Sequence, residues 1–452
     1  MREILEKLVN ECVKGIIATM SDSVAKGSFT QAVSATKKLT DNLGVQVLEL
    51  LCRQADETYE RSRNRKQITI KDKSKTRRLL TELGEVQITR ICYFDKKRNC
   101  RFFAVDEMLG LERRSRIETG LKSKIIEQAT LSSYGAATKA FGVSRQTAHN
   151  LAQSLRNIEL KKEDVIVAPK SVANIYIEAD EDHIHLQNGR SAEVKLVYVH
   201  EGAQSVCKGR NQLQNVKYFA TMDDDPDEIW NNVAQYVYKT YSLSNATVHV
   251  SGDGAPWIRY ALNVLPRARY HIDKFHVQKS ATNIAKGDKK MRAAIMRAVN
   301  FGNVDSLQQL CVAQARRYTS LTERRTISEN YYYLRNNIAN YSKNSRCSAE
   351  GHISHVLSER MSSRPMGWSR KGADRMAQLR AFYFNGGNFL DLFTSHDGDK
   401  RIEQTSDEKQ RRRYKNHVVK KYRRIYESYP IPALCGVVGD EQQRLKSFLS
   451  QK

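Results

Sequence analysis

No stretch of this sequence approaches the roughly 20 consecutive apolar residues that a membrane-spanning helix needs, and the chain opens on an amphipathic helical pattern instead of a signal peptide. The sequence also lacks Cys-x-x-Cys motifs, and its eight cysteines are scattered along the chain. These absences argue against a spanning protein, a disulfide framework and a structural zinc site. They favour a cytoplasmic protein with reduced thiols.

Acidic residues are outnumbered. Asp and Glu total 50 against 75 Lys and Arg, which gives a formal net charge of +25 over 452 residues. A surplus of this size, on a chain long enough for two or three domains, indicates a polyanionic partner, and nucleic acid is the usual one. An anionic membrane surface is the alternative.

The N-terminal region combines helical and strand patterns. Residues 1–60 show helical periodicity, and Glu85–Phe94 with Arg101–Val105 alternate like a β-hairpin. Between them lie two basic segments, Arg61–Lys66 and Lys71–Arg78. These segments have two interpretations, a solvated connector or an arm that contacts phosphates.

Residues 116–165 are predicted to form a helix-turn-helix DNA-binding domain. Small residues that suit close helix packing are followed by a turn glycine and a serine that suits an N-cap; these are Ala136, Ala137, Ala140, Gly142 and Ser144. One irregularity is Thr138, where the usual pattern prefers alanine. The outer face of the second helix would read base edges through Arg145, Gln146, His149 and Asn150.

Residues 170–279 carry strand patterns followed by strand–helix alternation. The expected strands are Val172–Gln187, Glu193–His200, Lys217–Thr221, Ala246–Val250 and Ala268–Ile272. Asn188–Gly189 is a strong hairpin-turn signal after the first. Three antiparallel strands, a helix, and then alternating strands and helices are typical of a ribonuclease-H-like α/β fold, in which acids on the first and fourth strands meet.

Two of these strands carry candidate acids. The fourth ends at Asp253 between two glycines that allow close approach, although such a motif alone is more often a turn or an N-cap. The first offers Glu178, Asp180 and Asp182, which point to one face, while Glu181 points to the other. Alternation cannot choose among the three, and we prefer the middle one, Asp180.

A third acid is expected from a later helix. Residues 280–345 have the pattern of a basic, all-helical insertion, and a helix after it has a core face formed by Ile353, Val356, Leu357 and Met361. Glu350 falls on this face and Glu359 on the opposite, solvated one. A carboxylate on the core side of a helix start either closes a metal site or complements the helix dipole.

Grouped carboxylates suit phosphoryl transfer. Mg²⁺ prefers hard oxygen ligands and can share them with a substrate phosphate. Two such ions about 3.5–4 Å apart activate the attacking hydroxyl and stabilise the leaving oxygen. Two divalent ions, Mg²⁺ or Mn²⁺, are therefore the expected cofactors.

Five motifs follow one another along the chain: Glu178-Ala-Asp-Glu-Asp-His183, Ser251-Gly-Asp-Gly-Ala-Pro-Trp257, Asp273-Lys-Phe-His276, Ser348-Ala-Glu-Gly-His-Ile-Ser-His-Val356 and Ser363-Arg-Pro-Met-Gly-Trp-Ser369. In this order they resemble the ISLre family of bacterial insertion-sequence transposases, which are relatives of the Mutator-type DDE transposases. The similarity runs along most of the chain, including the hairpin and the helix-turn-helix.

The resemblance implies a DNA transposase whose metal triad is Asp180, Asp253 and Glu350. It implies an accessory role for Asp273 and His276, and it leaves Asp182 as the other candidate for the first acid. It also implies double-stranded DNA partners, namely terminal inverted repeats and target DNA. A homo-oligomer on DNA and a bacterial, nucleoid-associated location follow from the same likeness.

Further basic residues are expected to contact DNA. Near the third acid these are Arg364 and Arg370, and in the tail they are Arg411, Arg412 and Arg413, interleaved with tyrosines. A solvated basic helix is the alternative for the tail.

These patterns divide the chain into six parts. They are an N-terminal region (1–115), the helix-turn-helix (116–165), a first core segment (170–279), the helical insertion (280–345), a last core segment (346–395) and a basic C-terminal region (396–452). The expected function is Mg²⁺-dependent strand cleavage and strand transfer. The alternatives are a catalytically silent, sequence-specific DNA-binding protein derived from a transposase, and a structure-selective nuclease.

Overall fold

The computed structural model describes residues 2–155, 158, 168–207, 210–265, 267–342, 347–364 and 366–399. It has two compact units: one comprises the described residues up to Leu155 together with Phe389–Gly398, and the other comprises the described residues between Leu155 and Phe389. Helices and strands both contribute, so the protein is of the mixed α/β class that the sequence predicts. Within the described part, no helix has the length and apolarity needed to cross a membrane.

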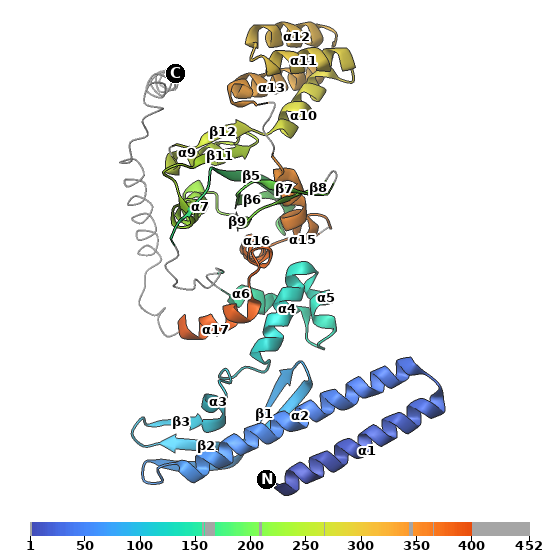
Figure 1. Cartoon of the computed structure of the whole chain (residues 1–452), viewed down its shortest axis with the longest axis vertical. Helices are drawn as coiled ribbons and strands as arrows, with labels where there is room; N and C mark the ends of the chain where they lie inside the picture. The colour runs from blue at the N-terminus through green and yellow to red at the C-terminus, as the bar shows by residue number, and fades with distance from the viewer. Residues whose placement is uncertain are drawn as a thin grey trace. The chain divides into compact units, whose positions relative to one another are not determined.

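The N-terminal unit begins with two long helices that lie side by side in opposite directions, α1 (Arg2–Lys26) and α2 (Phe29–Ser62) (Figure 1). They are followed by a three-stranded antiparallel sheet of β1 (Ile68–Thr81), β2 (Gly84–Asp95) and β3 (Cys100–Phe103). The second helix packs on β2, and their shared core includes Cys52, Ala55, Val86 and Ile88.

The basic segment Lys71–Arg78 is part of strand β1, so its interpretation as a connector is wrong, and contact of this strand with phosphates stays a prediction. Most of its side chains are exposed, which suits an edge strand of a sheet. Arg77 turns inward instead: its Nη1 lies 3.2 Å from Asp106, and its Nη2 donates to the carbonyls of Glu112 and Ser115 at 2.7 Å. Asp106 lies on α3 (Ala104–Met108) and also pairs with Arg90.

Three further helices follow along the chain in this unit: α4 (Thr119–Leu131), α5 (Tyr134–Lys139) and α6 (Arg145–Ser154). Gly142 makes the turn before α6 with a φ of 63°, a left-handed conformation that favours glycine. Ser144 caps α6, because its Oγ accepts a hydrogen bond from the N–H of Thr147 at 3.2 Å.

Of the small residues predicted to allow close helix packing around α5, only some are buried. Ala137 is buried, but Ala136 and Ala140 are exposed, so they do not mediate helix packing. Thr138 takes a buried position instead and satisfies its hydroxyl by donating to the carbonyl of Tyr134 at 2.9 Å. A threonine is therefore tolerated here because its polar atom bonds within its own helix.

The second unit is built on a five-stranded sheet in the order β12-β11-β5-β6-β9. The strands are β5 (Asn174–His185), β6 (Ser191–His200), β9 (Lys217–Thr221), β11 (Thr247–Gly252) and β12 (Arg269–Ile272). Pairing is antiparallel for β5–β6–β9 and parallel for β5–β11–β12. All five predicted strands are confirmed, with ends shifted by a few residues.

One face of this sheet is apolar. Ile175, Ile177, Val197, Val248 and Val250 pack against α7 (Pro226–Thr240), α8 (Pro256–Arg259) and α9 (Ala261–Val264). Because side chains alternate along a strand, the residues between them point to the other face. Two short pairings lie outside this sheet: β4 (Lys170–Ser171) with β10 (Tyr241–Ser242), and β7 (Ala203–Cys207) with β8 (Arg210–Leu213).

Helices follow the sheet in sequence. The array α10 (Lys274–Ala285), α11 (Lys289–Asn300), α12 (Val304–Arg316) and α13 (Leu321–Asn337) surrounds its own core of Ile284, Ile295, Leu307 and Leu334, and the turn η1 (Ile338–Asn340) ends it. Next come α14 (Ala349–Ile353), the π-helical turn η2 (Ser354–Ser358), α15 (Glu359–Met361), α16 (Arg370–Phe384) and α17 (Phe389–Asp399). The seven described cysteines are free thiols.

Candidate active site

The three acids that alternation could not separate have different partners in the structure. Glu178 is 3% exposed, and its carboxylate accepts hydrogen bonds from the backbone N–H of Ser348 at 2.6 Å, from His200 at 3.1 Å and from the Tyr198 hydroxyl. Burial acts to raise the pKa of Glu178, but these hydrogen bonds outweigh it and lower the pKa. Glu178 is therefore a buried anchor for the segment that leads into α14.

Asp182 is also engaged. Its two carboxylate oxygens accept hydrogen bonds from the hydroxyl of Ser362 at 2.8 and 3.2 Å. Ser362 follows the helical segment 349–361, whose first residue comes directly after the Ser348 that Glu178 binds. Asp180 lies between these two anchors, and the one hydrogen bond described for its carboxylate comes from the N–H of Glu181 at 2.9 Å. Of the three acids, Asp180 thus keeps the most freedom to bind another group.

Strand register brings three aspartates into a row. The parallel pairing of β11 with β5 ends at Ser251 and Glu178, and Asp253 and Asp180 each lie two residues further on. Asp273 directly follows β12, the neighbour of β11 on its other side. The carboxyl ends of parallel strands meet at one edge of a sheet, so this edge gathers Asp180, Asp253 and Asp273.

The glycines beside Asp253 are required by close approach. A Cβ on Gly252 would lie 3.0 Å from the carbonyl oxygen of Ala179 and 2.8 Å from Ile258. Gly254 has a φ of 100°, which side chains rarely allow. Asp253 itself also makes a turn, since one carboxylate oxygen accepts from the N–H of Ala255 at 2.8 Å. The turn interpretation and the site interpretation of Asp253 are therefore compatible.

The carboxylates at this edge repel one another. Burial raises the pKa of Asp180, the carboxylates of Asp253 and Asp273 raise it further, and His276 acts in the opposite direction. Asp273 is 3% exposed, and its pKa is raised by burial and by nearby Glu178 and Glu350, again against His276. The Nε2 of His276 is 3.9 Å from Asp273. Crowded carboxylates of this kind fit a hard divalent cation such as Mg²⁺.

Glu350 does not lie on the core face of its helix, so this expectation is wrong. The buried residues of the stretch 349–361 are Ala349, Ile353, Val356, Leu357, Arg360 and Met361, whereas Glu350 is exposed. Its helix start is fixed by Ser348, which bonds Glu178 and turns Ala349 inward. Glu350 is the next residue and is exposed, but its charge is close enough to raise the pKa of Asp273.

The π-helical turn η2 follows directly after α14. Such turns leave backbone carbonyls without their usual helical partners and are frequent at functional sites. Here Arg380, which is fully buried on α16, donates to the carbonyls of His355 and Val356 at 2.6 Å. Arg380 therefore stabilises the irregular helix that carries Glu350.

The tightest group of metal-type ligands lies elsewhere. Among the described residues, the ligand atoms of Glu181, His183 and Glu193 all lie within 4.8 Å of one another. Asp180, Asp253 and Glu350 are not such a set, so their carboxylates would have to draw closer together to share an ion. Glu181 points away from Asp180, as alternation predicts, and accepts a hydrogen bond from the indole of Trp257.

The predicted DNA-contacting residues are found in several environments. Arg145, Gln146 and Asn150 are exposed on α6, but His149 is half-buried with its ring 5.7 Å from that of Tyr134. Arg364 is exposed. Arg370 is partly neutralised, because it lies 2.7 Å from Asp224 and donates to a backbone carbonyl. Arg411, Arg412 and Arg413 lie outside the described residues.

Sequence reasoning missed the buried network around Glu178. The Tyr198 hydroxyl contacts both Glu178 and the Ser348 hydroxyl, and the Tyr198 ring lies 4.5 Å from that of His352. The sequence gives one indication of this network: Glu178 and Asp180 are two residues apart on a strand, which places both on one face of β5. Nothing local in the sequence pairs Ser348 with a strand 170 residues earlier.

The fold and the site define a mixed α/β protein with a carboxylate-rich edge on a five-stranded sheet. The chain belongs to the uncharacterised protein family UPF0236, whose family model matches residues 25–396. UPF0236 protein TTE2489 of Caldanaerobacter subterraneus subsp. tengcongensis is 35% identical over 388 residues, 83% of each chain. UPF0236 protein TTE0402 of the same bacterium is 35% identical over 400 residues, which cover 86% of this chain and 80% of the relative.

A further relative from that bacterium is 34% identical over 375 residues, 81% of this chain and 80% of the relative, and its name joins eleven locus labels, from TTE0033 to TTE2212. Another name joins four such labels. One bacterium therefore carries many copies of proteins of this family.

Proposed function

We propose that this protein is a DNA transposase of the ISLre type, with a ribonuclease-H-like core. The order of the sheet supports the fold: the first three strands of the core pair in antiparallel fashion, and the fourth and fifth run parallel to the first. That arrangement places an acid of the first strand beside an acid at the end of the fourth, as the ribonuclease-H-like fold requires.

The observation that carries the proposal is the row of carboxylates at one edge of the sheet. Asp180 and Asp253, from adjacent parallel strands, and Glu350, from α14, would hold divalent metal ions of the Mg²⁺ or Mn²⁺ type. When bound, such ions lower the pKa of an attacking water or hydroxyl and stabilise the leaving oxygen. Asp273 caps α10 through the N–H of Phe275 and, with His276, would position the site.

DNA recognition would lie with α5 and α6, which we propose form a helix-turn-helix. The supporting features are the capped second helix, the left-handed turn at Gly142 and the exposed Arg145, Gln146 and Asn150. The net charge of +25 fits double-stranded element ends and target DNA as partners, and a homo-oligomer on DNA is part of the proposal.

The copy number of the relatives supports a mobile element. Names that join four and eleven locus labels of one bacterium describe proteins present many times in a genome. A self-mobilising element produces such copies, whereas a housekeeping enzyme does not require them.

The test uses a supercoiled plasmid that carries the gene with its flanking DNA, incubated with the purified protein and Mg²⁺. The intact protein should cut at the element ends and join them to new DNA, and Asp180→Asn should abolish both steps. Asp182→Asn is the matched control on the same face of β5, and it should retain activity because an amide oxygen can still accept from Ser362.

Each other outcome identifies a different function. Specific binding without any metal-dependent cutting by the intact protein would indicate a silent DNA-binding regulator. Cutting without joining would indicate a structure-selective nuclease. Loss of activity in Asp182→Asn with activity retained in Asp180→Asn would reverse the assignment of the first acid.

A further inference from the structure

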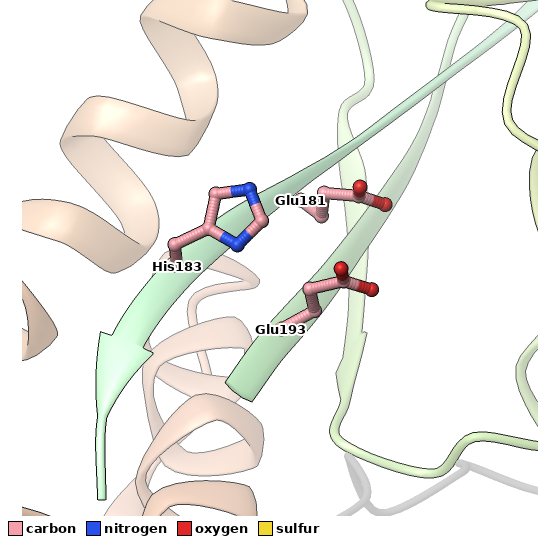
Figure 2. Close-up of side chains that lie close together, drawn as sticks. All are labelled: Glu181, His183 and Glu193. Carbon is pink, nitrogen blue, oxygen red and sulfur yellow. The ribbon is translucent and has the colours of Figure 1, made fainter. Parts of the chain in front are cut away.

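A second group of ligand-type side chains lies on the face of β5 opposite to Asp180. Glu181 and His183 are two residues apart on β5, so they share a face, and His183 is paired directly with Glu193 of β6. Figure 2 shows the two carboxylates pointing in the same direction with the His183 ring beside them. Because register and alternation fix all three positions, the group does not depend on a mobile loop.

The donor atoms of this group are available to a ligand. Within the described residues, neither the His183 imidazole nor the Glu193 carboxylate has a hydrogen bond or ion pair, and both side chains are exposed. Lys195, two residues from Glu193 on β6, is directed elsewhere: its ammonium donates to the carbonyls of Asp223 and Asp224 at 2.7 and 3.2 Å. Lys195 therefore pairs with neither of the two carboxylates.

A hydrogen bond from a neighbouring side chain orients the Glu181 carboxylate, as is common for carboxylates that bind metal ions. One of its carboxylate oxygens, Oε2, accepts from the indole N–H of Trp257, which leaves the other oxygen for a ligand. Outer hydrogen bonds of this kind fix a ligating carboxylate and raise metal affinity. Trp257 in turn packs at the core against Trp230, with ring centroids 6.3 Å apart.

Space for additional ligands adjoins the group. His183 and Glu193 line a cleft of about 730 Å³ at the β5–β6 hairpin, whose wall also includes Arg190, Trp368 and Arg370. Three protein ligands beside open space are the arrangement of metal sites that keep a position for water or substrate.

We propose that Glu181, His183 and Glu193 bind a divalent transition-metal ion of the zinc class, at a site separate from the Asp180–Asp253 edge. The imidazole nitrogen decides the class of ion, because nitrogen ligands suit Zn²⁺ and its transition-metal neighbours, whereas Mg²⁺ and Ca²⁺ favour sites made of oxygen alone. The open side of the ion would face the cleft with its two arginines.

The test measures Zn²⁺ binding to the full-length protein by equilibrium dialysis, in excess Mg²⁺. The protein carries Asp180→Asn and Asp253→Asn, so that the proposed active site cannot contribute. One bound ion is expected, and both His183→Ala and Glu193→Gln in this background should weaken binding by at least tenfold to a hundredfold. His185→Ala is the matched control, because His185 lies two residues further along the same exposed face of β5, and it should leave binding unchanged.

Co²⁺ in place of Zn²⁺ supplies a second readout. A visible absorption band that is present with His185→Ala and absent with His183→Ala would place the imidazole on the ion. Trp257→Phe keeps an aromatic ring in the core but removes the outer hydrogen bond, and it should weaken binding about 10–100-fold.

Three results would overturn the proposal. One is the same Zn²⁺ stoichiometry and affinity in His183→Ala and Glu193→Gln as in their parent. Another is a bound ion in the wild type that disappears in the Asp180→Asn, Asp253→Asn parent, which would place it at the active-site edge. The last is a folded wild type that binds no Zn²⁺ at millimolar concentrations. The second result would support a metal site at the Asp180–Asp253 edge, and none of the three contradicts the transposase proposal, because DNA cleavage is measured separately.

Discussion

Substitution of Gly252 by alanine tests the packing that brings Asp253 beside Asp180. The added Cβ would lie 3.0 Å from the backbone oxygen of Ala179 and 2.8 and 2.9 Å from two Ile258 carbons. A side chain can shift, but the Ala179 oxygen belongs to the central strand and cannot move without displacing Asp180. Overpacking of this type costs about 1–3 kcal/mol, so Gly252→Ala should lower the free energy of unfolding of this unit by about that amount.

Tryptophan fluorescence isolates the unit concerned, since all three tryptophans, Trp230, Trp257 and Trp368, lie within it. With a urea dependence of about 2 kcal/mol per molar, a loss of about 2 kcal/mol moves the midpoint by about 1 M. Gly351→Ala is the control, because a Cβ there meets nothing within 4 Å, and its midpoint should stay or rise slightly. An unchanged midpoint for Gly252→Ala would refute the close approach.

Three further predictions follow from individual contacts. Asp106→Asn leaves the guanidiniums of buried Arg77 and half-buried Arg90 without their shared carboxylate, so the N-terminal unit should lose about 3–5 kcal/mol of unfolding free energy. This loss would appear as a circular-dichroism transition at lower urea, with the tryptophan transition unchanged. Burial, followed by the His271 charge, lowers the pKa of His249 below 6.5, so its contribution to stability is complete above pH 6.5 and is lost as the pH falls below it; His249→Gln should flatten this part of the pH–stability curve. Arg145→Ala should reduce discrimination between end DNA and random DNA by about 1–3 kcal/mol in competition binding, and an unchanged ratio would move recognition to another surface.

The parts of the fold that the sequence predicted correctly are those with a strong local pattern. Apolar residues identified β5 and β11 by their alternation and β6 by a nearly continuous run, which is buried on both faces. Ser144 and Gly142 marked α6 through cap and turn chemistry. Strand β1 was missed because Lys71–Arg78 has few apolar positions, and the β7–β8 hairpin because β7 is exposed along its whole length.

The sequence singled out carboxylates that the structure places along one sheet edge, but it did not show their contacts. Parity placed Glu178, Asp180 and Asp182 on one face, yet only tertiary contacts show that two of them anchor a distant helix. The exposure of Glu350 could not be foreseen, since it depends on Ser348 bonding a residue 170 positions earlier. Neither could the π-helical turn, which depends on Arg380 from another helix.

The most direct test of the central claim is the rate of Mg²⁺-dependent cleavage at element-end DNA by the wild type and by Glu350→Gln. The account predicts that Glu350→Gln loses essentially all cleavage while still binding the DNA. Glu359→Gln, on the same helical segment and with a side chain 63% exposed, should cleave at the wild-type rate. Normal cleavage by Glu350→Gln would contradict the proposal that Asp180, Asp253 and Glu350 form one catalytic site.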